Sequence, residues 1–87
     1  MPYILKSERE RIDPVLTPLL QLMKDTPFSG KDGDLAYIIY KLLDNSYQLS
    51  FSAYNSGLGV LEAVGKEFYR RKVAVYEDEK IKANGDV

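Results

Sequence analysis

Carboxylates are the plentiful side chains of this sequence that could take part in catalysis. The chain contains no histidine and no cysteine, which excludes imidazole acid–base chemistry, thiolate catalysis, disulfides and zinc sites built from soft ligands. An enzyme made from it must therefore use carboxylates, lysine, arginine, tyrosine or serine. We expect no cofactor, because the sequence contains no complete phosphate loop, dinucleotide fingerprint or calcium-binding loop.

A magnesium-dependent enzyme acting on nucleotides or other phosphorylated small molecules is the hypothesis that uses these carboxylates. Two acidic residues at helical spacing can share one face of a helix and hold a divalent cation through their oxygens. No complete motif of this kind stands out, so this is the alternative hypothesis and the catalytic residues are unknown. The candidate metal ligands under this hypothesis are Asp34, Glu62, Glu67 and Asp78.

Three consecutive basic residues, Arg70, Arg71 and Lys72, raise the question of nucleic-acid binding. On a helix, consecutive side chains point in directions about 100° apart, so these three cannot form a single patch. Glu67 precedes Arg71 by four residues, which is the favourable orientation for an ion pair on a helix surface. With a net charge of −1 and acidic residues nearby, binding to nucleic acid is not expected.

The composition is that of one small helical domain spanning residues 1–87. Apolar residues make up 45% of the chain and charged residues 29%, which is ordinary for a folded protein and unlike a disordered one. A chain of 87 residues buries a smaller fraction of its surface than a domain of typical size, so a second subunit would help to complete its core. The sequence has neither an apolar stretch of signal-peptide length at its start nor a run of about 18 apolar residues, so we expect a cytoplasmic protein with no membrane partner.

The first of three predicted helices spans residues 13–24. Asp13 is suited to cap this helix and Pro14 to occupy its first position. Pro18 would clash with the carbonyl of Pro14 in a regular helix. Either the helix kinks there or Thr17 caps a later start.

A second helix is predicted over residues 34–47, after a turn rich in glycine in which Asp32 or Gly33 is suited to cap it. Its apolar residues repeat at the three-and-four spacing of a stripe that faces a core. Tyr40 and Tyr47, seven residues apart, lie together beside that stripe. We interpret them either as the edge of the core with their hydroxyls in water or as a contact with another subunit.

The segment YQLSFSAYNS, residues 47–56, alternates apolar and polar residues and could form a short strand around Phe51. A strand needs a partner strand, and the chain offers little to pair with it. A packed loop is therefore the preferred interpretation, with Asn55 or Ser56 capping the next helix.

The third predicted helix spans residues 56–84 and stops at the dipeptide Asn84-Gly85. Most of its apolar residues fall within an arc of about 140°. If unbroken, its roughly 29 residues would extend about 43 Å, whereas a compact chain of this size has a radius of gyration of only about 12 Å. We predict an all-α fold, an antiparallel bundle of about three helices in which the long C-terminal helix overshoots the bundle.

Three stretches of the sequence resemble a family of small uncharacterised proteins of bacteria, archaea and phages. They are GDLAYII at residues 33–39, GVLEAVGKEFYRR at 59–71 and YEDEKIKANGDV at 76–87, and the last is the most specific. The resemblance implies no activity and assigns no catalytic residues. Relatives often have proline where this chain has Val75, which suggests that the long helix is broken near that position into residues 56–74 and 76–84.

We therefore predict a non-enzymatic helical protein that self-associates as a homodimer or a larger oligomer. Whether it binds a small molecule is left open. Lys72 and Glu79 both project into the apolar arc of the third helix. Either Lys72 extends its stem over the core, or the two charges set the register of a contact with a second subunit. The predicted interaction surface consists of Tyr40, Tyr47, Phe68, Lys72, Val75, Tyr76 and Glu79.

Overall fold

The computed structural model describes residues 3–87, and the regular elements in that range are all helical. No strand forms there, so the all-α prediction is confirmed. Along the chain, two shorter helices are followed by a longer helix and by one continuous helical rod. They are α1 (Lys6–Arg9), α2 (Asp13–Asp25), α3 (Phe28–Ser46), and a rod made of α4 (Phe51–Phe68), the π-helical turn η1 (Tyr69–Val73) and α5 (Ala74–Asn84).

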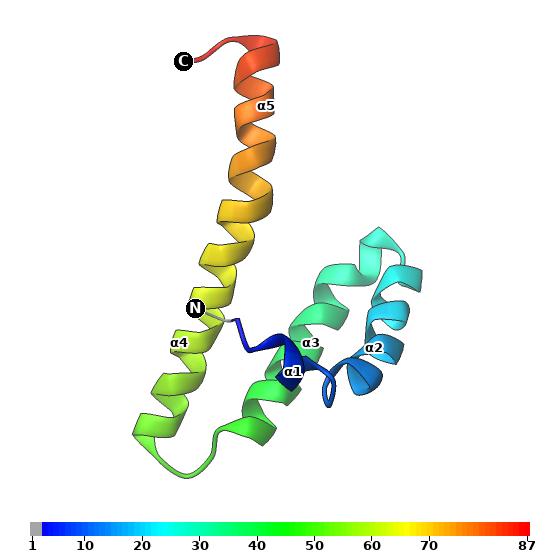
Figure 1. Cartoon of the computed structure of the whole chain (residues 1–87), viewed down its shortest axis with the longest axis vertical. Coiled ribbons are helices and arrows are strands. Elements are labelled where there is room, and N and C mark those ends of the chain that lie inside the picture. The colour runs from blue at the N-terminus through cyan, green and yellow to red at the C-terminus, as the bar shows by residue number, and fades with distance from the viewer. Residues whose placement is uncertain (1–2) are drawn as a thin grey trace.

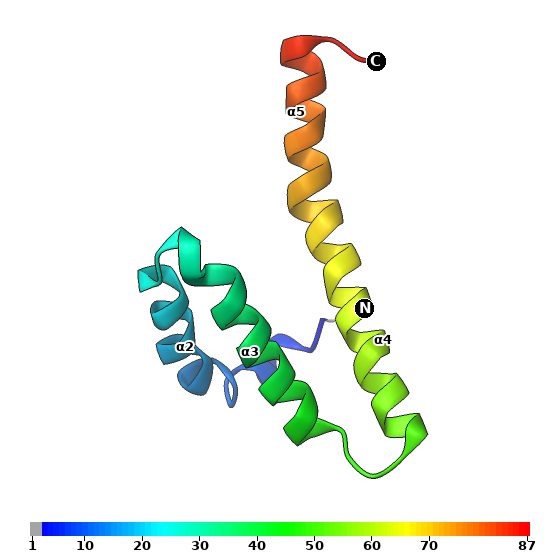
Figure 2. The same cartoon turned by 180° about the vertical axis from the view of Figure 1, so that it is seen from behind.

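The helices form an open arrangement in place of a closed bundle. Figures 1 and 2 show α2 and α3 side by side, while the rod leaves the end of α3 at an angle and carries α5 away from the other helices. The N-terminal segment crosses from α1 to the middle of the rod. The radius of gyration is 16.4 Å, compared with about 12 Å for a compact chain of this length. The long C-terminal helix is therefore confirmed, and its end does extend beyond the rest of the chain.

The ends of α2 depart slightly from the prediction. Ile12 occupies the cap position and Asp13 is the first helical residue, next to Pro14. Pro18 lies inside the helix, so a later start at Thr17 was wrong. The Thr17 hydroxyl does not cap a helix but donates a hydrogen bond to the carbonyl of Asp13, at 2.8 Å.

Helix α3 begins at Phe28, well before the predicted start at residue 34. The turn-forming residues Asp32 and Gly33 lie within its first turns, and Pro27 occupies the cap position. One polar contact supports this early start: the Lys31 ammonium donates a 2.7 Å hydrogen bond to the carbonyl of Met23 in the last turns of α2. That carbonyl is among the last four of its helix, which have no partner within the helix.

Helix α4 begins at Phe51, so the prediction of a packed loop or strand there was wrong, as was a cap at Asn55 or Ser56. Ser50 is the cap, because its hydroxyl oxygen accepts a 3.0 Å hydrogen bond from the backbone N–H of Ala53. The predicted stop at the other end of the rod is confirmed. Helix α5 ends at Asn84, and Gly85 has a φ of 89°, a conformation that glycine adopts without cost.

The rod does not break near Val75, but it changes its winding just before that residue. Tyr69–Val73 form a π-helical turn, which accommodates one extra residue in the helix. The Tyr69 hydroxyl donates a 3.3 Å hydrogen bond to Oε2 of Glu77, eight residues away. In a regular α-helix, residues eight apart point about 80° away from each other, and one extra residue brings them into line. Residues after the turn are therefore displaced by about 100° from uniform winding.

The described residues enclose almost no core. Within residues 3–87 no hydrophobic side chain is buried, and Gly57 of α4 is the one residue that is buried. The close packing between the two long bodies lies at Gly57, where a Cβ atom would come within 3.0 Å of the ring of Tyr47 and 3.4 Å of the side chain of Leu43. None of the described helices has both the length and the apolar character needed to cross a membrane.

Candidate functional site

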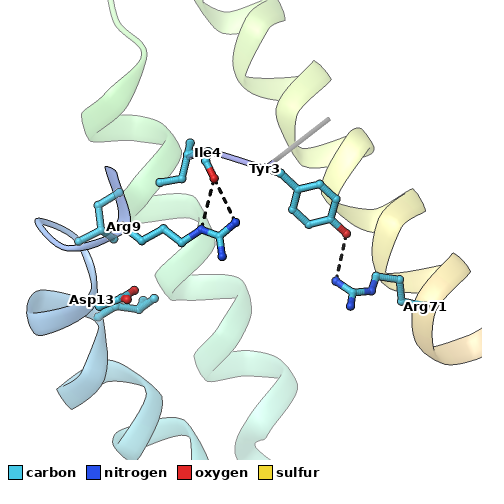
Figure 3. Close-up of a pocket in the computed structure, with 7 residues that line it drawn as sticks. Tyr3, Ile4, Arg9, Asp13 and Arg71 are labelled. Atoms are coloured by element: carbon cyan, nitrogen blue, oxygen red, sulfur yellow. Dashed lines mark hydrogen bonds between the residues drawn. The ribbon is translucent and has the colours of Figure 1, made fainter. Parts of the chain in front are cut away.

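Four side chains join the N-terminal segment to the rod, and we call them the Tyr3 cluster: Tyr3, Glu67, Arg70 and Arg71. The hydroxyl of Tyr3 donates a 2.8 Å hydrogen bond to Oε1 of Glu67. It also accepts one of 3.0 Å from Nη1 of Arg71 (Figure 3). The Arg70 guanidinium donates to the same oxygen of Glu67. The Arg71 guanidinium also lies 5.9 Å from the centre of the Tyr3 ring, within range of a cation–π contact.

The electrostatics of the Tyr3 cluster keep Glu67 ionised. The hydrogen bonds from Arg70 and Tyr3 lower the pKa of the Glu67 carboxyl below its usual value, because they favour the charged form. The same hydrogen bond to Glu67 raises the pKa of the Arg70 guanidinium. Only 13% of the Glu67 side chain is exposed, so this carboxylate is committed to its partners within the chain. One turn further on, the charge of Glu77 raises the pKa of the Tyr69 phenol.

A cavity of about 370 Å³ opens beside Tyr3, between the N-terminal segment and the start of α2. Arg9, Asp13 and Arg71 place charges of both signs on its wall. The Arg9 guanidinium donates to the carbonyl of Ile4 through Nε at 3.3 Å and Nη2 at 3.1 Å (Figure 3). Arg9 is the last residue of α1 and Arg71 lies in the rod, so their bonds to Ile4 and Tyr3 tie the N-terminal segment to α1 and to the rod.

The second feature is an apolar groove between α3 and α4 near the loop that joins them, and we call it the tyrosine groove. Its volume is about 480 Å³. The contact of Tyr47 with Gly57 brings the two helices together at its floor. The Tyr54 hydroxyl accepts a 3.3 Å hydrogen bond from the backbone N–H of Leu49 in the loop. The groove is lined by Tyr40, Leu43, Asp44, Tyr47, Tyr54, Gly57 and Leu58.

Comparison with known proteins identifies a family but no activity. A family described as "Domain of unknown function (DUF6899)" matches residues 1–87. The chain belongs to this family. No curated protein and no solved structure matches it. The family description carries no chemistry, so any function has to be argued from the residues and their geometry.

The structure distributes the predicted interaction surface over three places. Tyr40 and Tyr47 line the tyrosine groove. Phe68 and Lys72 line a separate cavity of about 380 Å³ next to Tyr3. The other three residues lie on α5, beyond the π-helical turn, and all are exposed: Val75, Tyr76 and Glu79.

Sequence reasoning missed several residues of both features. Tyr3 lies 64 residues from Glu67 along the chain, and no pattern in the sequence signals their contact. Tyr54 falls in the segment interpreted as a packed loop and Leu58 near the start of the third predicted helix, and neither was singled out, although both line the tyrosine groove. The signal that could have placed them is Ser50, a helix cap that puts both residues within about the first two turns of α4.

The carboxylates of the magnesium hypothesis are not brought together. Asp34 lies on α3, Glu62 and Glu67 on α4, and Asp78 on α5. Glu62 forms a 3.2 Å ion pair with Lys66, and Glu67 belongs to the Tyr3 cluster. Across residues 3–87, no group of three or more acidic side chains is arranged to hold a metal ion.

Proposed function

We propose that this chain is a non-enzymatic helical protein whose working form is a homodimer or a larger homo-oligomer. The observation that carries this proposal is the exposed area. The chain exposes 7783 Å², whereas a compact monomer of 9.9 kDa exposes about 5,200 Å². Each chain therefore exposes about 2,600 Å² more than a compact monomer of the same mass.

This excess has the size of an obligate interface. Obligate homodimers bury a total of about 2,000–5,000 Å², or about 1,000–2,500 Å² on each subunit. The exposed apolar side chains also include the residue types that such interfaces favour, since tyrosine and phenylalanine are prominent among them. Covering this surface with further copies of the chain would give each copy the apolar core that it lacks alone.

A second copy of the chain is the partner that fits this need best. Fixing the backbone of each residue costs about 1–2 kcal/mol of conformational entropy, which burial of apolar surface must offset. With no buried hydrophobic side chain within residues 3–87, a single chain has little to set against that cost. A second copy carries the same exposed surface, so one two-fold contact supplies burial to both chains.

The test is to measure mass and thermal stability over a range of protein concentrations. We expect light scattering behind size-exclusion chromatography to give a mass at least twice 9.9 kDa at micromolar concentration. Because association stabilises the folded state by mass action, the Tm should also rise with protein concentration. A folded monomer whose Tm does not depend on concentration would overturn the proposal.

A further inference from the structure

Two highly exposed apolar side chains lie at and just after the loop between α3 and α4. Leu49 in the loop is 93% exposed, and Phe51 at the start of α4 is 82% exposed. They lie at the same end of the molecule as the tyrosine groove, because Tyr47 and Tyr54 of that groove lie on either side of Leu49 and Phe51 in the sequence. One end of the molecule therefore presents both protruding apolar side chains and an apolar groove.

The backbone of Leu49 is held in a costly conformation. Its φ is 70°, and within residues 3–87 Leu49 is the one residue other than glycine that has a positive φ. Leucine has a Cβ that disfavours this left-handed region, and such a residue persists only where its surroundings hold it. The Tyr54 hydroxyl bonds to the Leu49 N–H and so ties the strained loop to the groove wall. In a single chain this strain presents an apolar side chain to water, which gives no compensating burial.

We infer that this end of the molecule is the interface between two copies of the chain, with Leu49 and Phe51 of each copy packing into the tyrosine groove of the other. The inference rests on the proposed self-association and identifies the surface that carries it. A two-fold contact of this kind is self-complementary, because each chain supplies one protruding set and one groove. The groove has the aromatic lining that interface centres favour, and of the residues that line it one, Asp44, is charged.

The exposed surface of α5 is less suited to an apolar contact. On α5 the apolar residues do not share one face, because Tyr76 lies about 100° from Val75 and about 140° from Ile81 around the helix. The four residues from Glu77 to Lys80 are all charged and exposed. The ammonium of Lys80 lies 5.4 Å from the centre of the Tyr76 ring and covers part of it. The excess area per chain is large enough for one obligate interface. At the loop end of α3 and α4, a groove and highly exposed apolar side chains occur together.

The decisive experiment compares two phenylalanines in matched positions. Phe51 is the first residue of α4 and is 82% exposed, and Phe28 is the first residue of α3 and is 87% exposed. Alanine at either position removes the same side chain from the same helical position. We expect Phe51→Ala to raise the dimer dissociation constant, measured by sedimentation velocity on the full chain, by about tenfold or more. Phe28→Ala should leave the constant within about twofold of the unmodified chain.

A second variant guards against loss of folding. Leu49→Gly removes the apolar side chain and relieves the backbone strain, because glycine adopts a positive φ freely. It should keep the helical circular dichroism of the unmodified chain and also raise the dissociation constant by about tenfold or more. Fully helical Leu49→Gly and Phe51→Ala chains that associate as tightly as the unmodified chain would overturn this interface while leaving self-association standing. An unmodified chain that is monomeric at every concentration would overturn both.

Discussion

The contact between Gly57 and Tyr47 predicts opposite effects of alanine at two neighbouring glycines of α4. A Cβ atom at Gly57 would lie 3.0 Å from Cδ2 of Tyr47 and 3.4 Å from Cδ2 of Leu43. A Cβ atom at Gly59 would have nothing within 4 Å. Gly57→Ala must therefore displace the Tyr47 ring, whereas Gly59→Ala adds a methyl group in open space.

The expected magnitudes follow from two opposing terms. Alanine in place of glycine inside a helix stabilises the fold by about 0.5–1 kcal/mol, and both variants gain this. Inserting a methyl group into a filled contact costs about 1–3 kcal/mol, and only Gly57→Ala incurs this cost. We therefore expect Gly59→Ala to be more stable than the unmodified chain, and Gly57→Ala to be less stable than Gly59→Ala by about 1–3 kcal/mol.

The assay is urea unfolding followed by circular dichroism, with all three chains at the same protein concentration. Matched concentration matters because association contributes to the measured free energy of unfolding. The series is repeated at about a tenfold lower protein concentration. A difference in free energy of unfolding that comes from the helix contact stays the same at both concentrations, whereas one that comes from association changes. Equal free energies of unfolding for the two variants would show that α3 and α4 do not pack at Gly57, and the reasoning would fail.

Four further predictions concern single side chains. Ser50→Ala should destabilise the fold by about 1 kcal/mol in urea unfolding, because it removes the cap of α4; an unchanged midpoint would contradict this. Pro18→Ala should raise the unfolding free energy by up to about 3 kcal/mol, because it restores a backbone donor inside α2. A variant less stable than the unmodified chain would contradict this and would mean that the proline ring makes a stabilising packing contact. Since the fold lowers the pKa of Glu67 from its value of 4.5, the stability due to this carboxylate is present above pH 4.5 and is lost as the pH falls through the lower, folded-state pKa. NMR titration should find that Tyr3→Phe raises the pKa of Glu67, and an unchanged value would show that the Tyr3 hydroxyl does not bond to it.

Much of the helical content could be predicted because it depends on local patterns. Helix α2 is confirmed over nearly the predicted range, and Gly85 ends α5 as the dipeptide signal indicated. The starts of α3 and α4 were wrong for a physical reason. Glycine and alternating residues lower helix propensity only by about 1 kcal/mol or less per residue, so contacts such as Lys31 with Met23 and the cap at Ser50 can extend a helix through them.

The site residues were harder to predict than the helices. Each feature depends on contacts between segments that are distant in sequence, such as Tyr3 with Glu67 and Arg71, and no helical period reports these. Tyr40 and Tyr47, which the helical period placed close together, both line the tyrosine groove, although Tyr47 lies just past the end of α3 in extended backbone. The groove that they line also needs α4, whose start the sequence did not reveal.

The π-helical turn separates the two ends of the rod as interaction surfaces. A uniformly wound helix would place Phe68 and Val75 on one apolar face, and the interaction surface predicted from the sequence depended on that alignment. The bond between Tyr69 and Glu77 shows that the winding is offset by about one residue between α4 and α5. Val75 consequently points well away from the line of Phe68, and α5 cannot extend the apolar face of α4. An interface at the loop end of α3 and α4 needs no such extension, because its groove and its protruding side chains all lie before the π-helical turn.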